Sequence, residues 1–222
     1  LWLPGQTLLL GHDSGMTFDP ITHLLDRLHV WTQRLGIGTD QSAGLLGAIV
    51  FIHGLEALLV WVGFSMQWMQ KLQFVFWFVT PGLAMYYFVH KTWSDKKYLP
   101  LIASVIYMLN FFLIQAWFVA ERTKFSIYVA LPLIIYFTFG YLSGKISYKK
   151  SIIATGLIIG FFNAGGSFPL YGGLILAILS IFLYEYFLHF GREIIKKTIL
   201  FSLGVGVIYA LLNAFWLFTY LF

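Results

Sequence analysis

The chain alternates between long apolar stretches and short polar connections, after a comparatively polar beginning in residues 1–41. The apolar stretches lie near residues 44–66, 72–90, 99–120, 126–143, 151–162, 168–189 and 198–222. Most of them approach the roughly 20 residues that a helix needs to cross a hydrocarbon core. Because backbone groups in lipid must satisfy one another's hydrogen bonds, we expect these stretches to be helices. The pattern predicts an all-α fold, a polytopic transmembrane bundle with about six spans in residues 72–222.

The composition also indicates a membrane protein. Of the 222 residues, 59% are hydrophobic and only 10% are charged, whereas soluble proteins carry about 25% charged residues. The chain has no cysteine, which excludes disulfides and thiol nucleophiles. It begins without methionine and ends in an apolar stretch at Phe222, so we expect a fragment of a longer protein.

The basic residues indicate the topology. Segments 91–98, 144–150 and 191–197 hold nine of the fourteen lysines and arginines, and their order in the chain puts them on one side of the membrane. The positive-inside rule makes that side cytoplasmic. Residues 1–71 then form an extracytoplasmic first loop with short amphipathic helices. Since topology explains the basic residues, the pI near 9.3 does not call for a nucleic-acid partner, and the lipid bilayer is the expected one.

The stretch 44–66 admits two interpretations. If it spans the membrane, residues 1–41 become cytoplasmic. It contains His53 and Glu56, however, and a carboxylate at mid-membrane is energetically expensive. We therefore expect a helix that lies on the membrane or re-enters it, which keeps residues 1–71 outside the cytoplasm.

Within residues 1–41 a helix start is readable. Asp19 suits the N-cap position and Pro20 the first helical position. Apolar residues then follow at helical spacing, at Ile21, Leu24, Leu25 and Leu28. This apolar face would lie on the bilayer or pack on neighbouring helices. We expect the helix to end between residues 31 and 35, and Thr39 or Asp40 to cap a following helix.

The fragment "GHDSG" contains the residues His12, Asp13 and Ser14. Adjacent side chains cannot align as a catalytic triad, and Ser14 lacks the G-x-S-x-G motif. Composition alone favours an Asx-type turn at Asp13. A metal site would require other ligands to come near, from His23, His29 or Asp40. No recognised ligand spacing is present, so no cofactor is predicted and a divalent cation stays open.

The segments "DSGMTFDPITHLLDRLHVW" (13–31) and "GIGTDQS" (36–42) resemble the N-terminal part of bacterial arabinofuranosyltransferase-type membrane glycosyltransferases with the GT-C fold. That family has a first-loop aspartate, an Asp-Pro or Asn-Pro helix start, a helix with the pattern aliphatic-Arg-aliphatic-His-aliphatic-Trp, and a glycine–glutamine turn. The corresponding residues here are Asp13, Asp19, Pro20, Arg27, His29, Trp31, Gly36 and Gln41. Gly15 stands where the family commonly has a basic residue. Beyond residue 42 the resemblance is looser.

The resemblance implies an inverting enzyme of the prokaryotic plasma membrane that transfers a pentosyl or hexosyl group. The donor would be a polyprenyl-phosphate sugar and the acceptor a glycan outside the cytoplasm. Asp13 would act as general base on the acceptor hydroxyl. The implied substrate-binding residues are His12, Asp19, Arg27, His29, Trp31, Asp40, Gln41 and Glu121. Glu121 otherwise reads as half of a surface ion pair with Arg122.

Two other functions stay open. A transporter or flippase of lipid-linked saccharide would have ionisable residues at mid-membrane and inverted repeats, and no convincing repeat is visible. A non-catalytic assembly protein of the cell envelope would use Asp13 only as a turn residue.

Overall fold

The computed structural model describes residues 8, 17–29, 31–32, 39–40, 47–119, 122–162, 168–189 and 192–214. Within them the regular elements are helices, except for one pair of two-residue strands. The predicted all-α class is confirmed. Three helices in this part are long and apolar enough to cross a membrane, within Met66–Thr92, Lys124–Leu142 and Glu193–Leu212. They indicate a membrane protein.

The N-terminal part begins with α1 (Pro20–Arg27). Strands β1 (Trp31–Thr32) and β2 (Thr39–Asp40) then pair antiparallel. The predictions that the first helix reaches residues 31–35 and that Thr39 or Asp40 caps the next helix are therefore wrong. Tryptophan and threonine favour extended backbone, and the cross-strand pairing supplies the hydrogen bonds that a longer helix would have made.

A π-helix, η2 (Ala48–Gly54), continues directly into α3 (Leu55–Trp61). Together they are shorter than the roughly 20 residues that a span requires. The remaining helices are α4 (Met66–Thr92), α5 (Leu99–Met108), α6 (Phe111–Val119), α7 (Arg122–Leu142), α8 (Tyr148–Phe161), α9 (Phe168–His189) and α10 (Arg192–Leu212).

The expected helix over residues 99–120 is broken in two at Asn110. The Asn110 amide donates to the carbonyl of Tyr107 at 2.6 Å, which ends α5. Its side-chain oxygen accepts from the backbone N–H of Leu113 at 3.1 Å, which caps the start of α6. One side chain thus satisfies backbone groups on both sides of the break.

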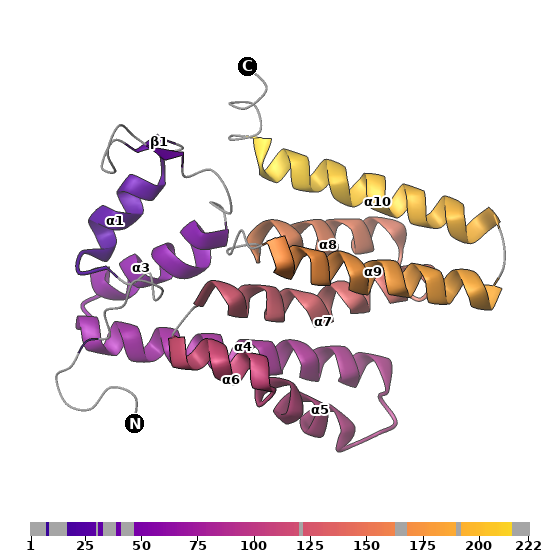
Figure 1. Cartoon of the computed structure of the whole chain (residues 1–222), viewed down its shortest axis with the longest axis horizontal. Helices are drawn as coiled ribbons and strands as arrows, with labels where there is room; N and C mark the ends of the chain where they lie inside the picture. The colour runs from indigo at the N-terminus through magenta and orange to yellow at the C-terminus, as the bar shows by residue number, and fades with distance from the viewer. Residues whose placement is uncertain are drawn as a thin grey trace.

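The helices form a layered bundle in which α4 packs on α5 and α7, α7 on α8 and α9, and α8 on α10 (Figure 1). A buried core lies between α4, α6 and α7, around Phe74, Trp77, Leu113, Phe125 and Val129. Helices α8 and α10 approach closely at Gly156, where an added Cβ would lie 2.5 Å from the Ile208 side chain. Small residues at such contacts are typical of membrane helices.

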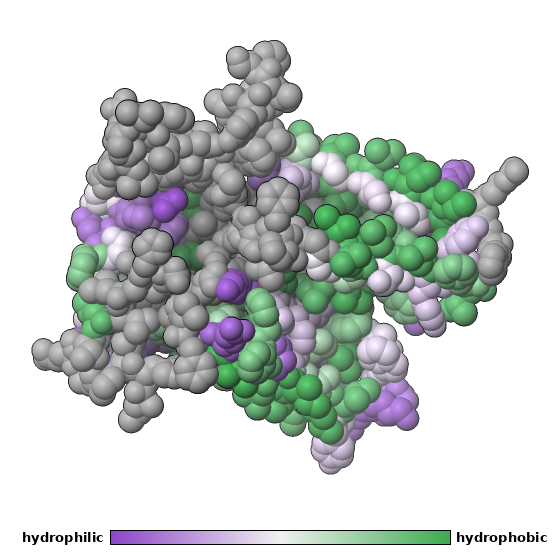
Figure 2. Space-filling model, viewed as in Figure 1, coloured by the Kyte–Doolittle hydropathy of each residue, from purple (hydrophilic) through white to green (hydrophobic). Residues whose placement is uncertain are grey.

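The two ends of the bundle differ in chemistry. Figure 1 shows the α4–α5, α7–α8 and α9–α10 ends together on the right, while α1 and α3 lie on the left. The right-hand ends carry the three basic segments. On the face seen in Figure 2, hydrophobic residues cover most of the described helical body between these ends. The basic segments thus share one end, as the sequence predicts.

Candidate functional site

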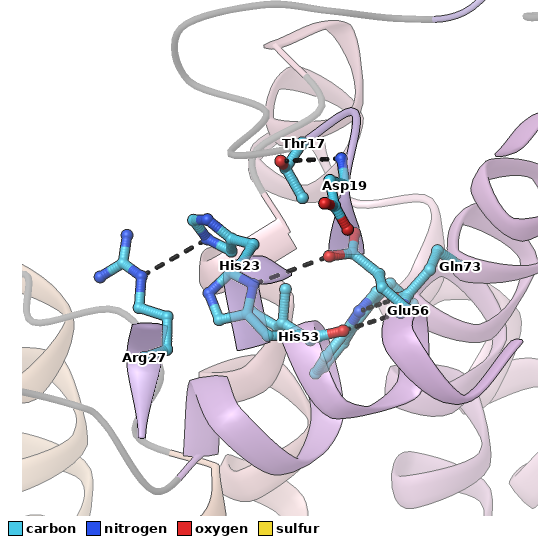
Figure 3. Close-up of polar contacts among 9 residues, drawn as sticks. Thr17, Asp19, His23, Arg27, His53, Glu56 and Gln73 are labelled. Atoms are coloured by element: carbon cyan, nitrogen blue, oxygen red, sulfur yellow. Dashed lines mark hydrogen bonds and ion pairs between the residues drawn. The ribbon is translucent and has the colours of Figure 1, made fainter. Parts of the chain in front are cut away.

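The side chains of His23, Arg27, His53 and Glu56 meet where α1 packs on η2 and α3; we call them the α1–α3 cluster (Figure 3). Helix α1 turns its polar side toward this cluster. Its apolar residues Ile21 and Leu25, with Leu28 at the C-cap, face outward and are exposed by 39%, 55% and 55%, whereas Leu24 is partly buried. An outward apolar face is what a helix lying on a bilayer would present.

The start of α1 is fixed by Asp19. The backbone N–H of Thr22 donates to its carboxylate at 3.1 Å, and its own N–H donates to the hydroxyl of Thr17 at 3.3 Å. Pro20 occupies the first turn and is buried. The predicted N-cap is confirmed, and such a cap is worth about 1 kcal/mol. Asp19 therefore has a structural role here, as the N-cap of α1.

Arg27 holds His23 through a charged hydrogen-bond donor. The Arg27 Nε–H donates to Nε2 of His23 at 3.4 Å, one helical turn away. Burial, then the neighbouring His53 and Arg27, lower the pKa of His23 to about 4. Near neutral pH His23 is thus uncharged, with its lone pair on Nε2 and its proton on Nδ1. Burial also lowers the pKa of Arg27, yet a guanidinium stays charged in proteins.

His53 joins the two helices of the cluster. Its ring lies edge-on to the ring of His23, with 4.6 Å between centroids. Its Nδ1 lies 3.6 Å from Oε2 of Glu56, three residues further along. Glu56 is fully buried and His53 is nearly so. A buried carboxylate is tolerated only with such partners.

The π-helix positions this pair. An added Cβ at Gly54 would lie 2.5 Å from the carbonyl oxygen of Ile49, so the wide turn requires glycine there. The carbonyl of Ile52 accepts a hydrogen bond from the backbone N–H of Leu55 and also one from Nε2 of Gln73 on α4, at 3.2 Å. Gln73 in turn accepts from the indole N–H of Trp77 at 2.9 Å. π-Helical turns frequently occur at functional sites.

The structure brings together only some of the residues predicted from the sequence. Asp19 and Arg27 lie at opposite ends of α1, where Asp19 caps the helix and Arg27 belongs to the cluster. His29 lies beyond the helix, exposed, with its Nδ1 donating to the Leu25 carbonyl at 3.1 Å. The expectation that one helix carries Arg27, His29 and Trp31 is therefore wrong.

Trp31 and Asp40 are directly opposite each other in the strand pair. His12, Asp13, Gln41 and Glu121 lie outside the described residues. Within the part of the chain that the structure describes, no three His, Asp or Glu side chains are grouped so that they could hold a metal ion. The roles assigned to His12 and Asp13, and a divalent cation beside them, stay predictions.

Sequence reasoning missed the functional potential of His53, Glu56 and Gln73. His53 and Glu56 served only to decide the topology of residues 44–66, and His23 only as a metal-ligand candidate. The available signal was the i, i+3 spacing of a histidine and a glutamate in an apolar stretch. Such isolated ionisable residues are functional candidates by default.

The α1–α3 cluster combines an arginine, a neutral histidine and a histidine–carboxylate pair. These groups suit anion binding and proton transfer. Comparison of the chain with protein-family models, with curated proteins and with solved structures finds no match.

Proposed function

We propose that the chain is the membrane region of an inverting glycosyltransferase, which passes a sugar from a polyprenyl-phosphate donor to a glycan acceptor outside the cytoplasm. The observation that carries the proposal is the position of the α1–α3 cluster. It is a polar, ionisable site at the end of an apolar bundle, opposite the basic segments. By the positive-inside rule this end faces away from the cytoplasm.

The surroundings of the cluster support a position at the membrane surface. Helix α4 has 27 residues and is about 40 Å long, which exceeds a hydrocarbon core of about 30 Å. Near its start the Lys71 ammonium lies over the ring of Trp68, 5.1 Å from the centroid. Trp61 and Trp68 are exposed by 76% and 58%. Tryptophan and lysine of this kind are typical of the interface, where a lipid-linked phosphate lies.

Arg27 is the proposed phosphate ligand. Its Nε–H is engaged with His23, and a guanidinium has four further N–H donors in a geometry that suits phosphate oxygens. Since His23 is neutral, it orients the guanidinium without cancelling its charge. A bound phosphate would also compensate for the partial burial of Arg27, which lowers its pKa.

Asp13 is the proposed general base, as the family resemblance implies. It precedes the start of α1 at Asp19 by six residues, a span of at most about 20 Å. Its carboxylate would take the proton of the acceptor hydroxyl as the new C1–O bond forms. The bond from C1 to the donor phosphate breaks on the opposite face, so the anomeric configuration inverts and the polyprenyl phosphate leaves.

The test is sugar transfer by the full-length protein in proteoliposomes that contain a polyprenyl-phosphate pentose or hexose and a glycan acceptor. Asp13→Asn should lower transfer by roughly 10²–10⁴-fold, while the matched control Ser14→Ala should retain it. Equal transfer by wild type and Asp13→Asn at equal protein levels would refute the role of Asp13. Movement of the donor across the bilayer without transfer would instead indicate a flippase.

A further inference from the structure

A cavity of about 350 Å³ lies between α8, α9 and α10, on elements that do not contribute to the α1–α3 cluster. This volume lies within the range of small-molecule sites. Figure 1 shows α9 and α10 diverging from their connected end. Most of the cavity wall is apolar, with Ile159, Ile175, Ile178, Phe182, Phe201 and Val205 among its residues.

The wall of the cavity contains one buried hydroxyl group that has no hydrogen-bond partner among the described residues, that of Thr155. Thr155 is 1% exposed. The hydroxyls of Thr80 and Thr92 instead donate to the carbonyl four residues earlier, at 2.8 and 2.7 Å. Leaving a buried hydroxyl unpaired is unfavourable, so Thr155 points to a ligand oxygen in the cavity.

The surface around the cavity indicates where that ligand comes from. The outward faces of α9 and α10 are apolar and exposed, at Leu176, Leu179, Leu183, Leu203, Val207 and Leu211. In a membrane such faces contact lipid chains. A molecule that enters the cavity from the hydrocarbon core of the membrane has a long apolar part, and the cavity suits one acyl chain.

The basic end of the same helices supplies charge for a headgroup. The hydroxyl of Tyr148, at the start of α8, donates to the carbonyl of Leu200 at 3.0 Å, so the start of α8 lies beside α10 about two turns from the start of α10. Lys149 and Lys150 lie in the first turn of α8, and Lys196 and Lys197 lie in the second turn of α10. The acids nearby are Glu193 and Glu185, which line a second pocket together with Lys197. Thr155 lies seven residues from Tyr148, about 10 Å along the helix. Since the headgroup layer is roughly 5–8 Å thick, Thr155 lies near the level of lipid ester groups.

We propose that this cavity binds one anionic phospholipid from the leaflet at the basic end. One acyl chain fills the space between α9 and α10, and an ester carbonyl accepts the hydrogen bond from Thr155. The phosphate lies among the lysines of α8 and α10, as basic pockets on the cytoplasmic side commonly hold anionic headgroups.

The experiment uses the whole chain in vesicles of phosphatidylcholine that contain phosphatidylglycerol with a diazirine on one acyl chain. Labelled peptides are mapped after illumination. We expect labelling to concentrate in residues 175–182 and 201–209. Gly206→Leu should reduce it by about tenfold, because the glycine lines the cavity and its Cβ would project into open space. Gly173→Leu is the matched control: its Cβ also meets open space, on α9, and it does not line the cavity.

Two further variants separate the parts of the site. Thr155→Val keeps the side-chain shape and should weaken labelling by roughly two- to tenfold, and it serves as second test if Gly206→Leu fails to fold. Lys196→Gln with Lys197→Gln should abolish the preference for phosphatidylglycerol over phosphatidylcholine carrying the same diazirine. Labelling spread evenly over α9 and α10, unchanged in Gly206→Leu and in Thr155→Val, would show annular lipid only and overturn the proposal. Equal labelling by both lipids in wild type would overturn the anionic headgroup.

Discussion

Glu56 is fully buried, and Nδ1 of His53 lies 3.6 Å from its Oε2. A carboxylate in such a place is kept either for stability or for chemistry. The ring of His53 contacts the ring of His23, which in turn accepts the hydrogen bond from Arg27, so the two pairs are connected. At the residue scale, the cluster is one connected set of groups, in which removing a member alters the others.

We predict that His53 and Glu56 stabilise the fold as a coupled pair. His53→Leu should cost about 1–3 kcal/mol, because the buried carboxylate loses its imidazole partner. In the double variant His53→Leu with Glu56→Leu the costs should be less than additive, with a coupling energy of about 0.5–3 kcal/mol. The free energy of unfolding is measured in detergent, under reversible conditions, for wild type, His53→Leu, Glu56→Leu and the double variant. Strict additivity would mean that the two side chains do not interact.

His23 should make the docking of α1 dependent on pH. Its pKa is about 4 in the fold against about 6.5 when unfolded, so the unfolded state binds more protons between these values. The contribution of His23 to the free energy of unfolding is therefore fully present above pH 6.5 and decreases as the pH drops toward 4. Below pH 4 it no longer changes with pH. Burial is the largest cause of this low pKa; His53 and Arg27 lower the pKa further, while Glu56 and Asp26 raise it.

The measurement is the unfolding temperature of wild type and His23→Gln across this pH range. Glutamine retains an oxygen acceptor for the Arg27 Nε–H and does not titrate. The wild type should lose more thermal stability than the variant between pH 6.5 and 4. Parallel curves for the two proteins would contradict the assignment.

At the scale of elements, the π-helix is the feature that brings His53 and Glu56 toward α1. We predict that Gly54→Ala destabilises the protein by about 1–3 kcal/mol, because its Cβ would meet the Ile49 carbonyl oxygen at 2.5 Å. Gly206→Ala, a helical glycine with open space at its Cβ, is the control. It should be neutral or stabilising by up to about 1 kcal/mol. Equal effects of the two substitutions on the unfolding free energy would argue against a glycine requirement in η2.

Local sequence patterns predicted the start of α1 but not its end. Asp19 and Pro20 act within one turn, so their roles are visible in the sequence. The end depends on the pairing of Trp31 with Asp40, a contact between residues nine positions apart. The break at Asn110 was likewise missed, because an asparagine in an apolar stretch gives no sign of which backbone groups it will bond.

The candidate site shows the same division. Arg27 was proposed from a motif, and it does lie in the cluster. The contact of His23 with His53 joins residues thirty positions apart and depends on a π-turn that ordinary helical periodicity does not anticipate. Asp13, on which the proposed chemistry depends most, lies outside the described residues.

At the scale of the whole molecule, the charge pattern proved the most informative part of the sequence. The three basic segments were expected on one side, and the helix ends that carry them do lie together, at the end opposite α1 and α3. Long-range organisation was predictable here because alternation of spans determines it, without knowledge of any side-chain contact.

Everything proposed for Asp13 and the α1–α3 cluster requires that they lie on the membrane face opposite the basic segments. The chain has no cysteine, so single cysteines can report sidedness without background from the chain itself. Phe18→Cys lies beside α1, at a position 71% exposed, and Lys96→Cys lies in the α4–α5 connection, where the lysine side chain is 64% exposed. In intact cells a membrane-impermeant maleimide should label Phe18→Cys and not Lys96→Cys, and inside-out vesicles should reverse the result. Labelling of both positions from the same side would contradict the assignment.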